Sequence, residues 1–392
     1  MSDDVVVVGG GPAGSATALR LARAGVAVRV IERAAFPRRK VCGEYLSGGA
    51  VDALERLGVL DRVRAHAAPL RGVRLIAEGA PPVALSFARS ALACARDVLD
   101  ALLLDAAVAA GAIVERGRVE ELLFEDGRCG GVGVRTGDGA LVTRPARVVA
   151  GADGIGSLVA RKLGLAKPSL GRGRYAVGGH YSGFGALDAH VEMYVGGGAY
   201  FALNPLSELH ANVMVVVPKQ RLAQWSGDVD AGVGGAAAAL GRGVRSFTGA
   251  SRIGPRVSIG PLAHDVRRAA GSGAILIGDA AGFVDPFTGQ GIFLALTGAE
   301  RAADAILAAL ARPDRSARAF AAYARWRADD VAWRRRLCAA VALLVDVPPL
   351  ARRAARRVGR FPDAAALLME ALAGAIPPQR AFRPSVLGRF VV

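Results

Sequence analysis

The chain is poor in the residues that build metal sites and disulfide scaffolds. Only 4 of its 392 residues are cysteine, and none stands in a CxxC pair, so neither a zinc ribbon nor a disulfide framework is expected. Histidine is also scarce, and no pair among His180, His210 and His264 has metal-ligand spacing. We therefore predict no metal site. The cysteine usage suits a reducing cytoplasm, where we expect the protein to reside.

Long apolar runs and a signal peptide are absent as well. The segment nearest to a membrane span, residues 274–296, is interrupted by Asp279, Asp285 and Pro286, whereas a span needs roughly 18 apolar residues in a row. Residues 1–4 lack the basic start of a signal peptide. Because 52% of the residues are hydrophobic and 21% are charged, we expect a soluble protein with a large core.

Acidic residues are too few to balance the basic ones. The sequence has 50 Lys and Arg against 34 Asp and Glu, a formal net charge of +16, and the surplus is largest at 333–336 and 352–357. Such a balance permits attraction to phosphate, acidic proteins or anionic membranes without specifying a fold. A GC-rich coding sequence, indicated by the abundance of Ala, Gly and Arg, explains the same surplus.

A glycine-rich turn lies between a strand and a helix at the start of the chain. Residues 5–8 are an unbroken valine run, typical of a buried parallel strand. The segment 9–14, Gly-Gly-Gly-Pro-Ala-Gly, follows and leads into a helical pattern and then a second strand, 26–31, which ends in Glu32. A tight turn without a ligand is the simpler interpretation. The order of strand, helix, strand and acid favours a dinucleotide-binding fingerprint.

Each residue of this fingerprint has a physical role. Gly9 permits the turn, Gly11 lets the backbone approach a pyrophosphate, and Gly14 lets the helix pack closely on the strand. The diphosphate would lie at the positive end of the helix, and Glu32 would accept hydrogen bonds from a ribose diol. The acid disfavours a 2′-phosphate, so the fingerprint alone leaves both FAD and NAD open.

Two later segments have the same form, a buried strand that ends in a glycine-aspartate pair. The first, residues 148–157, runs into Asp153, and a helix is expected to begin near Ser157. The second, residues 274–282, ends in Gly278 and Asp279. Ligands of open α/β sheets bind at the carboxyl ends of strands, which is where both pairs are predicted to lie.

These three segments resemble the motifs of the flavoprotein family that includes aromatic-ring hydroxylases, geranylgeranyl reductases and flavin-dependent halogenases. The resemblance runs in order from Val5 to about Ala299. It implies that the cofactor is FAD. It also implies an α/β fold, in which a discontinuous Rossmann-like FAD-binding domain of the glutathione-reductase type carries an inserted antiparallel β-sheet substrate domain and a helical C-terminal region.

The resemblance also implies which residues hold FAD. Asp279 would bond the ribityl chain or the pyrophosphate side, and the amides of 289–291 would face the pyrimidine edge of the flavin. Lys40 and Cys42 match a Lys-x-Cys-Gly-Glu stretch that passes close to the cofactor. The implied cofactor-binding set is Gly9, Gly11, Pro12, Ala13, Gly14, Glu32, Arg33, Lys40, Cys42, Arg96, Asp153, Gly278, Asp279, Gly289, Gln290, Gly291 and Ile292.

Several of these residues have a plainer interpretation. Cys42 also fits a buried packing cysteine, and Arg96 fits a surface arginine at a helix start. Asp153 would either cap the helix that follows it or contact nicotinamide. Arg33 and Arg39 would either neutralise the pyrophosphate or be solvated.

The spacing of the motifs predicts the domains. We expect FAD-binding pieces at 1–70, 91–165 and 265–310, a substrate domain from 71–90 and 166–264, and helices over 311–392. Alternating β patterns occur at 71–87 and 175–217, and several short strands are expected within 113–149. We predict that the substrate sheet walls a cavity against the flavin, lined by Tyr200, Asn204 and Pro286.

The reaction is less closely specified than the cofactor. The Trp-x-Trp-x-Ile-Pro signature of the halogenases is absent, and the aromatic stretch of the geranylgeranyl reductases survives only as 200–205, with Ala202 at its tryptophan position. Residues 42–47 and 200–205 together resemble flavoproteins of secondary metabolism, including polyketide-associated ones. That resemblance favours oxygenation of an aromatic or polyketide-like molecule through a flavin hydroperoxide. Reduction of a C=C bond in a hydrophobic substrate is the alternative, and no catalytic residue is assigned.

No second complete nucleotide fold is visible for an electron donor. Residues 232–237 match GxGxxA, but no strand precedes them, so we expect a loop there. NADPH or NADH would then dock transiently, or a separate reductase would supply electrons. The small-molecule substrate is expected to be hydrophobic or aromatic. Residues 352–357 would dock an acidic carrier protein or a membrane, or be a solvated helix face, and association with nucleic acid is disfavoured.

Overall fold

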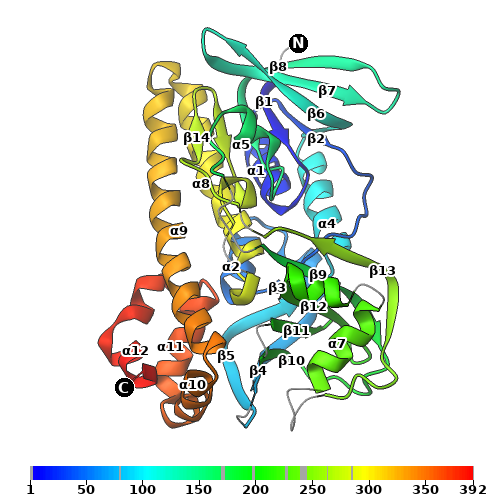
Figure 1. Cartoon of the computed structure of the whole chain (residues 1–392). Coiled ribbons are helices and arrows are strands. Elements are labelled where there is room, and N and C mark those ends of the chain that lie inside the picture. The colour runs from blue at the N-terminus through cyan, green and yellow to red at the C-terminus, as the bar shows by residue number, and fades with distance from the viewer. Residues whose placement is uncertain are drawn as a thin grey trace.

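The protein is seen in a computed structural model that describes residues 3–78, 81–168, 173–196, 199–225, 228–238, 245–262, 264–283 and 286–391. Two β-sheets lie one above the other in Figure 1, with a column of long helices beside them. None of the helices in the described ranges combines the length and the hydropathy of a membrane span.

Within the described residues, the first sheet has seven strands and a parallel centre. The strands β6, β2, β1, β8 and β15 are neighbours in that order and run parallel, while β7 pairs antiparallel with β6 and β8, and β14 with β15. The bounds are β1 (Asp3–Val8), β2 (Val28–Glu32), β6 (Ile113–Glu125), β7 (Arg128–Thr136), β8 (Leu141–Gly151), β14 (Ala270–Gly271) and β15 (Ala274–Leu276). The valine run that predicted a buried strand is β1.

The strands within 113–149 are longer than expected. The sequence predicted several short strands there, but the turns at Asp126-Gly127 and 137–139 connect three long ones, β6, β7 and β8. Positive φ angles at Asp126 and Gly127 form the first turn. In Figure 1 these strands lie across the top of the molecule.

In the part of the chain that the structure describes, the second sheet has eight strands in the order β13-β9-β12-β11-β10-β4-β5-β3. In the described ranges its strands pair antiparallel, as predicted, except that β10 runs parallel to β4. The bounds are β3 (Tyr45–Leu46), β4 (Ala68–Ala77), β5 (Val83–Ala93), β9 (Arg174–Ser182), β10 (His190–Gly196), β11 (Ala199–Pro205), β12 (His210–Pro218) and β13 (Ser251–Ile259).

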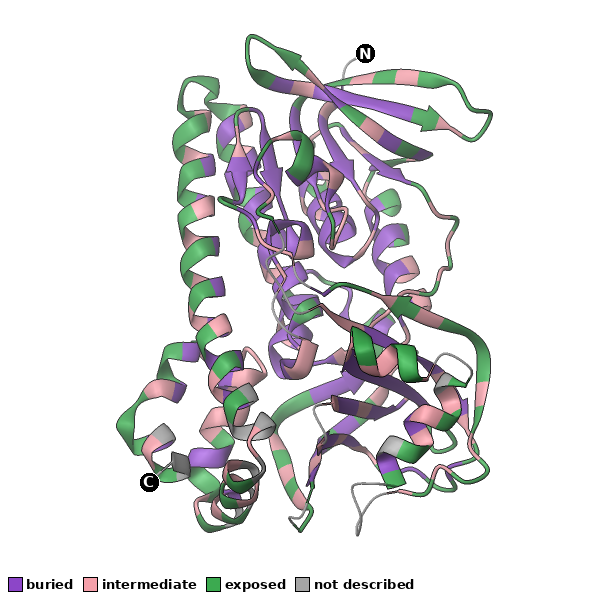
Figure 2. Ribbon diagram, in the orientation of Figure 1, coloured by how far each residue is buried: buried purple, intermediate pink, exposed green. Residues whose placement is uncertain are grey.

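Helices pack around both sheets and form the C-terminal part of the chain. Figure 2 shows buried residues concentrated in the sheets and exposed residues along the outer side of α9. The helices are α1 (Pro12–Arg23), α2 (Gly48–Arg56), α3 (Leu60–Arg64), α4 (Arg96–Ala109), α5 (Leu158–Lys162), α6 (Lys219–Gln224), α7 (Val229–Ala238), α8 (Gly291–Ala311), α9 (Ser316–Asp346), α10 (Pro348–Arg360), α11 (Pro362–Leu372) and α12 (Pro384–Val391). The helical character predicted after Ile292 is therefore confirmed.

The GxGxxA match at 232–237 lies inside a helix, so the loop predicted there is wrong. These residues belong to α7, and α6 rather than a strand lies before them. Alanine is the strongest helix former, and Val233 and Ala237 are buried in the core behind the second sheet. Packing of this small-residue face explains the helix.

Candidate cofactor and substrate site

The glycine loop joins β1 to α1 in a shape that side chains would prevent. Gly9 has φ +103°, and a Cβ at Gly14 would lie 1.8 Å from the Gly9 carbonyl oxygen. Gly11 is different, because a Cβ there would meet only a guanidinium nitrogen of Arg38, at 3.6 Å. Gly11, Pro12 and Ala13 line a cavity. Close packing thus explains the glycine at 14, whereas Gly11 leaves the helix start open to the cavity.

Glu32 holds this loop in place. It ends β2, its Oε2 accepts a hydrogen bond from the Gly10 amide at 2.8 Å, and its Oε1 accepts one from the Ala34 amide at 2.9 Å. Its expected contact with a ribose remains a prediction.

The segment after β2 brings a basic residue that the sequence analysis missed. Arg38 lies beside Gly11 and donates to Asp100 Oδ2 at 2.9 Å. Arg33 is exposed, and Arg39 pairs with Asp97 at 3.8 Å and lies near Gly254. The candidates for neutralising a pyrophosphate were Arg33 and Arg39, but the guanidinium next to the loop belongs to Arg38. The hydrogen bond to Asp100, a residue that only the folded chain brings close, holds Arg38 rather than Arg33 or Arg39 beside the loop.

Arg96 is buried rather than lying on the surface. It begins α4, and its Nε and Nη2 donate to Asp100 at 2.7 and 2.8 Å. Burial lowers the pKa of the guanidinium, but the charge of Asp100 and its hydrogen bonds outweigh burial, so the pKa lies above its usual range. Arg96 also lines the cavity, which makes it a fixed positive charge there.

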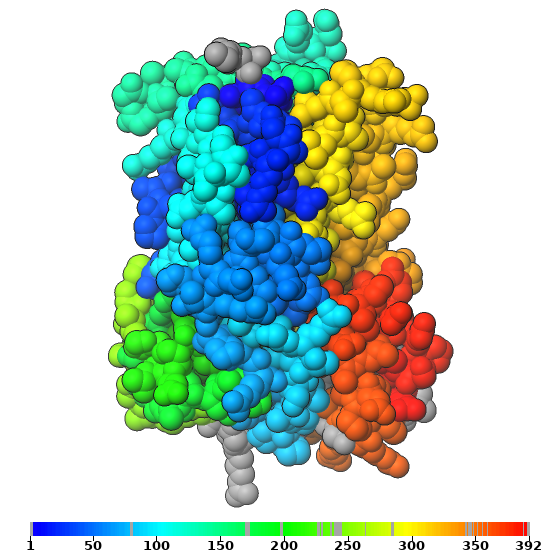
Figure 3. Space-filling view, turned by 180° about the vertical axis from the view of Figure 1, so that it is seen from behind, coloured from blue at the N-terminus to red at the C-terminus, as the bar shows by residue number. Residues whose placement is uncertain are grey.

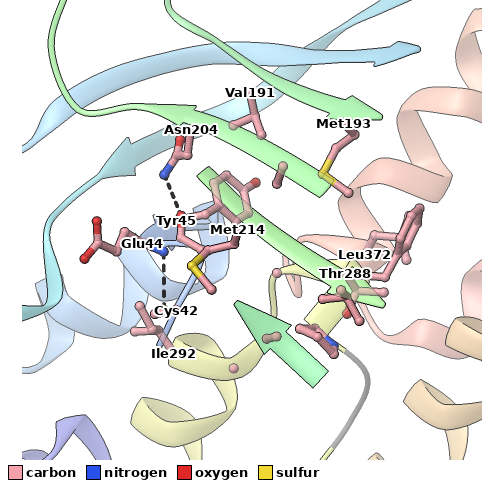
Figure 4. Close-up of a pocket in the computed structure, with 18 of the residues that line it drawn as sticks. Cys42, Glu44, Tyr45, Val191, Met193, Asn204, Met214, Thr288, Ile292 and Leu372 are labelled. Carbon is pink, nitrogen blue, oxygen red and sulfur yellow. Dashed lines mark hydrogen bonds between the residues drawn. The ribbon is translucent and has the colours of Figure 1, made fainter. Parts of the chain in front are cut away.

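Cys42 lies on the cavity wall, half-buried, and also packs against the main core. The Glu44 amide donates to Cys42 Sγ at 3.3 Å (Figure 4). Burial raises the pKa of this thiol, while the charge of Arg96 opposes the shift. The thiol therefore stays protonated near neutral pH, in contact with a cation that would stabilise its thiolate.

Glu44 has an uncommon backbone conformation and a buried carboxylate. Its φ is +57°, and only 4% of its surface is exposed. Oε1 accepts from the Arg96 amide at 2.9 Å, and Oε2 lies 2.7 Å from His180 Nε2. This pair connects the 40–45 segment to strand β9. In the sequence His180 is an isolated histidine, because its partner lies 136 residues away.

Asp153 caps a helix with both of its carboxylate oxygens. Oδ1 accepts from Ser157 Oγ at 2.6 Å, and Oδ2 accepts from the Leu158 amide at 2.7 Å and the Val159 amide at 3.2 Å. Helix α5 begins there, as predicted. Gly154 lines the cavity, whereas the Asp153 carboxylate is committed to the cap, which supports the structural interpretation of this residue.

Asp279 follows β15 and lines the cavity, as Lys40 does. Burial raises the pKa of Asp279 above its ordinary value of 3.8, although the charges of Lys40 and Arg96 oppose the shift. Burial also lowers the pKa of Lys40, and Arg96 and Arg38 add to that effect. Gly278 has φ +61°, and a Cβ there would lie 2.9 Å from the Ala13 side chain. The first and third motifs are therefore in contact.

The segment 286–292 supplies the next part of the cavity wall. Pro286, Gly289, Gly291 and Ile292 line the cavity, while Asp285 lies outside the described residues. The Gln290 side chain turns away: its Nε2 donates to the carbonyl of Leu372 and its Oε1 accepts from Arg334 at 2.9 Å. Only the backbone of Gln290 remains available for the predicted contact with a flavin.

The cavity extends from these loops along the inner face of the second sheet, with a volume of about 370 Å³. Residues at every second position of β10, β11 and β12 face it, as the period of a strand requires. They are Val191, Met193, Val195, Tyr200, Ala202, Asn204, Met214 and Val216. Val341 of α9 and side chains of α10 and α11 line the far end. Figure 4 shows Met193 and Leu372 at this apolar end and Cys42 at the other.

Tyr200, Asn204 and Pro286 all line the cavity, and their role toward a substrate remains a prediction. Asn204 Nδ2 donates to the Gly43 carbonyl at 2.9 Å, and its strand neighbour Asn212 donates to the Cys42 carbonyl at 2.7 Å. The Oδ1 atom of each amide is buried without a hydrogen-bond partner among the described residues. Asn212 was not predicted, although its place opposite Asn204 in a hairpin pattern was a usable signal.

The match to a family model supports FAD as the cofactor. Residues 2–335 match the FAD binding domain family. The digeranylgeranylglycerophospholipid reductase 2 of Methanopyrus kandleri is 31% identical over 342 residues, which cover 83% of this chain and 82% of that reductase. The menaquinone reductase of Mycobacterium tuberculosis is 34% identical over 311 residues, which cover 74% of this chain and 73% of that protein.

A solved structure has the same fold. The flavin-dependent brominase Bmp2 superimposes with a TM-score of 0.86 over 99% of this chain and 98% of the brominase, at 22% identity. At that identity the likeness concerns the fold alone.

Proposed function

The chain belongs to the FAD binding domain family of oxidoreductases, and from this premise we propose that it reduces C=C bonds in a long apolar molecule. The observation that carries the proposal is the cavity lining. Beyond Cys42 and Asn204, its wall consists mainly of aliphatic, methionine and aromatic side chains. Such a wall offers an extended hydrocarbon burial but gives a polar substrate few hydrogen bonds.

The residues around the glycine loop fit FAD. The cradle at Gly9 and Gly14 leaves no room for a Cβ, and the open face of Gly11 meets Arg38 at the start of α1. We propose that this face holds the diphosphate and that Asp279 and the amides of 289–291 hold the ribityl chain and the ring. When bound and reduced, FAD supplies the hydride for the reaction.

The chain's own contribution to the proposed reaction is a proton. Reduction of one C=C bond adds a hydride to one carbon and a proton to the other. We propose that Cys42 Sγ donates this proton, because burial keeps the thiol protonated and Arg96 stabilises the thiolate that remains. The hydrogen bonds from Asn204 and Asn212 to the Gly43 and Cys42 carbonyls fix the backbone that carries the thiol.

The relatives named above support reduction over oxygenation. Two relatives more than 30% identical to this chain are named as reductases, one of a digeranylgeranyl lipid and one of menaquinone. The sequence motifs favoured oxygenation, but the apolar wall gives reduction the stronger physical basis. We propose NADPH or NADH, or a separate reductase, as the electron source.

The test uses purified protein loaded with FAD and reduced without oxygen. Polyprenyl alcohols and prenylated quinones are added, and mass spectrometry should detect the gain of H₂ per double bond. Cys42→Ala should retain the flavin spectrum and lose most of this turnover, while Cys129→Ala, at a core cysteine away from the cavity, serves as the control. Full turnover in Cys42→Ala would remove the thiol from the proposed reaction.

Oxygen-dependent hydroxylation of an aromatic molecule is the second candidate. Asn204 Oδ1 is a buried acceptor without a partner among the described residues, on a residue that lines the cavity, and a phenol hydroxyl would satisfy it. This candidate predicts that product forms only in the presence of oxygen and carries one additional oxygen atom. Product that forms under anaerobic conditions would exclude it.

A further inference from the structure

A stripe of arginines runs along α10, outside the family match, which ends at residue 335. Arg352, Arg356 and Arg360 are four residues apart, so they lie on one helix face. Residues 348–392 contain eight arginines but only two acidic residues, Asp363 and Glu370. We call Arg352, Arg356 and Arg360 the α10 stripe.

The α10 stripe is not explained by the fold. Like charges four residues apart destabilise a helix. In the part of the chain that the structure describes, no carboxylate lies within 4.0 Å of these three guanidinium groups. Some arginines elsewhere are engaged in ion pairs, such as Arg96 with Asp100 and Arg245 with Glu192. Within the described residues the stripe therefore has no acidic partner, and the Arg360 guanidinium lies over the Phe361 ring.

The opposite face of α10 forms part of the cavity wall. Ala354 and Val358 line the apolar end of the cavity, together with Leu368, Met369 and Leu372 of α11. In the space-filling view, these C-terminal helices meet the β4 and β5 region at one end of the molecule (Figure 3). One short helix thus separates a positive surface from an apolar chamber.

We propose that the α10 stripe docks the protein on an anionic lipid surface, with the apolar end of the cavity close to that surface. This inference rests on the proposed function, because an apolar substrate dissolves in the lipid phase. Arginines near an anionic leaflet are attracted to it. Leu343, five residues before α10, is 59% exposed, and the Phe361 ring lies under the guanidiniums of Arg360 and Arg389. An exposed leucine near the start of the helix and a half-buried aromatic ring in contact with two arginines favour a lipid surface over an acidic protein.

The docking test needs no substrate. FAD-loaded protein is mixed with vesicles of phosphatidylcholine alone or with added phosphatidylglycerol, and binding is measured by flotation. We expect binding to the anionic vesicles only, and weaker binding as salt rises. The triple variant Arg352→Gln, Arg356→Gln, Arg360→Gln should bind them on the order of 100-fold more weakly. Arg→Lys at the same positions should keep most of the affinity.

The control removes the same charge elsewhere. Arg62, Arg116 and Arg118 are exposed, on α3 and β6, and their triple Gln variant should bind like the wild type. The proposal would be overturned if both triple variants lost binding to anionic vesicles equally or if the wild type bound neutral vesicles. Binding of an acidic acyl carrier protein instead of vesicles would also overturn it. The α10 triple Gln variant should lose vesicle binding and still reduce detergent-dissolved substrate normally. That result would show that docking and the proposed reaction are separate properties. A failure of the proposed function would leave the vesicle result unchanged.

Discussion

Gly11 and Gly14 lie in one turn, yet substitutions at them should fail for different reasons. A Cβ at Gly14 would lie 1.8 Å from a backbone oxygen, which cannot move without opening the turn. We expect Gly14→Ala to lower the free energy of unfolding of the apoprotein by about 3 kcal/mol. Gly11→Ala should change it by less than about 0.5 kcal/mol and still weaken FAD binding.

Urea unfolding of the apoproteins and a flavin fluorescence titration measure these two effects. If Gly11→Ala bound FAD like the wild type, the diphosphate would not lie against this residue. A stable Gly14→Ala apoprotein would mean that the turn relaxes more easily than its packing indicates.

Asp279 should make the stability of the apoprotein depend on pH. Burial raises its pKa in the folded state above the ordinary 3.8 of the unfolded chain. The stability that it contributes is therefore complete below pH 3.8 and is lost as pH rises through the raised pKa. Asp279→Asn cannot ionise, so its stability relative to the wild type should improve as pH rises above about 4. Unfolding both apoproteins across this range tests the sign, and a difference that does not change with pH contradicts it.

At the scale of elements, α9 connects the C-terminal part to the third motif. Tyr323 Oη donates to the Leu276 carbonyl at 2.8 Å, and Arg327 Nη2 donates to the carbonyls of Gly278 and Gly282 at 3.3 and 3.2 Å. The Nε and Nη1 atoms of Arg327 are buried without hydrogen-bond partners in the described ranges. Arg327 therefore carries a desolvation cost while it positions the loop around Asp279.

Arg327→Leu should separate positioning from stability. Its two lost hydrogen bonds are offset by relief of the desolvated charge, so we expect the free energy of unfolding to change by less than about 1 kcal/mol. The looser loop should weaken FAD binding roughly tenfold, a loss of about 1.4 kcal/mol. Arg325→Leu, on the exposed side of the same helix, is the matched control. Equal FAD affinity in the two variants would show that α9 does not position the loop.

Elements formed by neighbouring residues were predictable from the sequence, whereas contacts between distant ones were not. The β1–α1–β2 unit and the cap by Asp153 follow from residues within a few turns of each other. The parallel pairing of β4 with β10, the bond between Glu44 and His180, and the position of Arg38 depend on segments that only the folded chain brings together. The sequence did not predict that side chains of α10 and α11 line the cavity, because the apolar residues of an amphipathic helix do not indicate which cavity they face.

At the scale of the whole molecule, the segment 40–45 joins the two sheets. The amides of Asn204 and Asn212 hold it from the second sheet, and the Arg96 amide holds Glu44 from the side of the first. The cavity lies along this segment, so a ligand bound there would contact groups carried by both sheets. We therefore expect the two parts to unfold together and FAD to stabilise both.

The double variant Asn204→Ala, Asn212→Ala tests this coupling. Both amides are nearly fully buried, and their loss leaves the Cys42 and Gly43 carbonyls without these donors. In the wild type, FAD at 100 times its Kd should raise the stability by about 2.7 kcal/mol within a single calorimetric transition. In the double variant the second sheet should melt first, in a separate transition that FAD no longer shifts. Each single variant keeps one of these two hydrogen bonds and should retain a single transition. One FAD-sensitive transition in the double variant would mean that the sheets are coupled through other contacts.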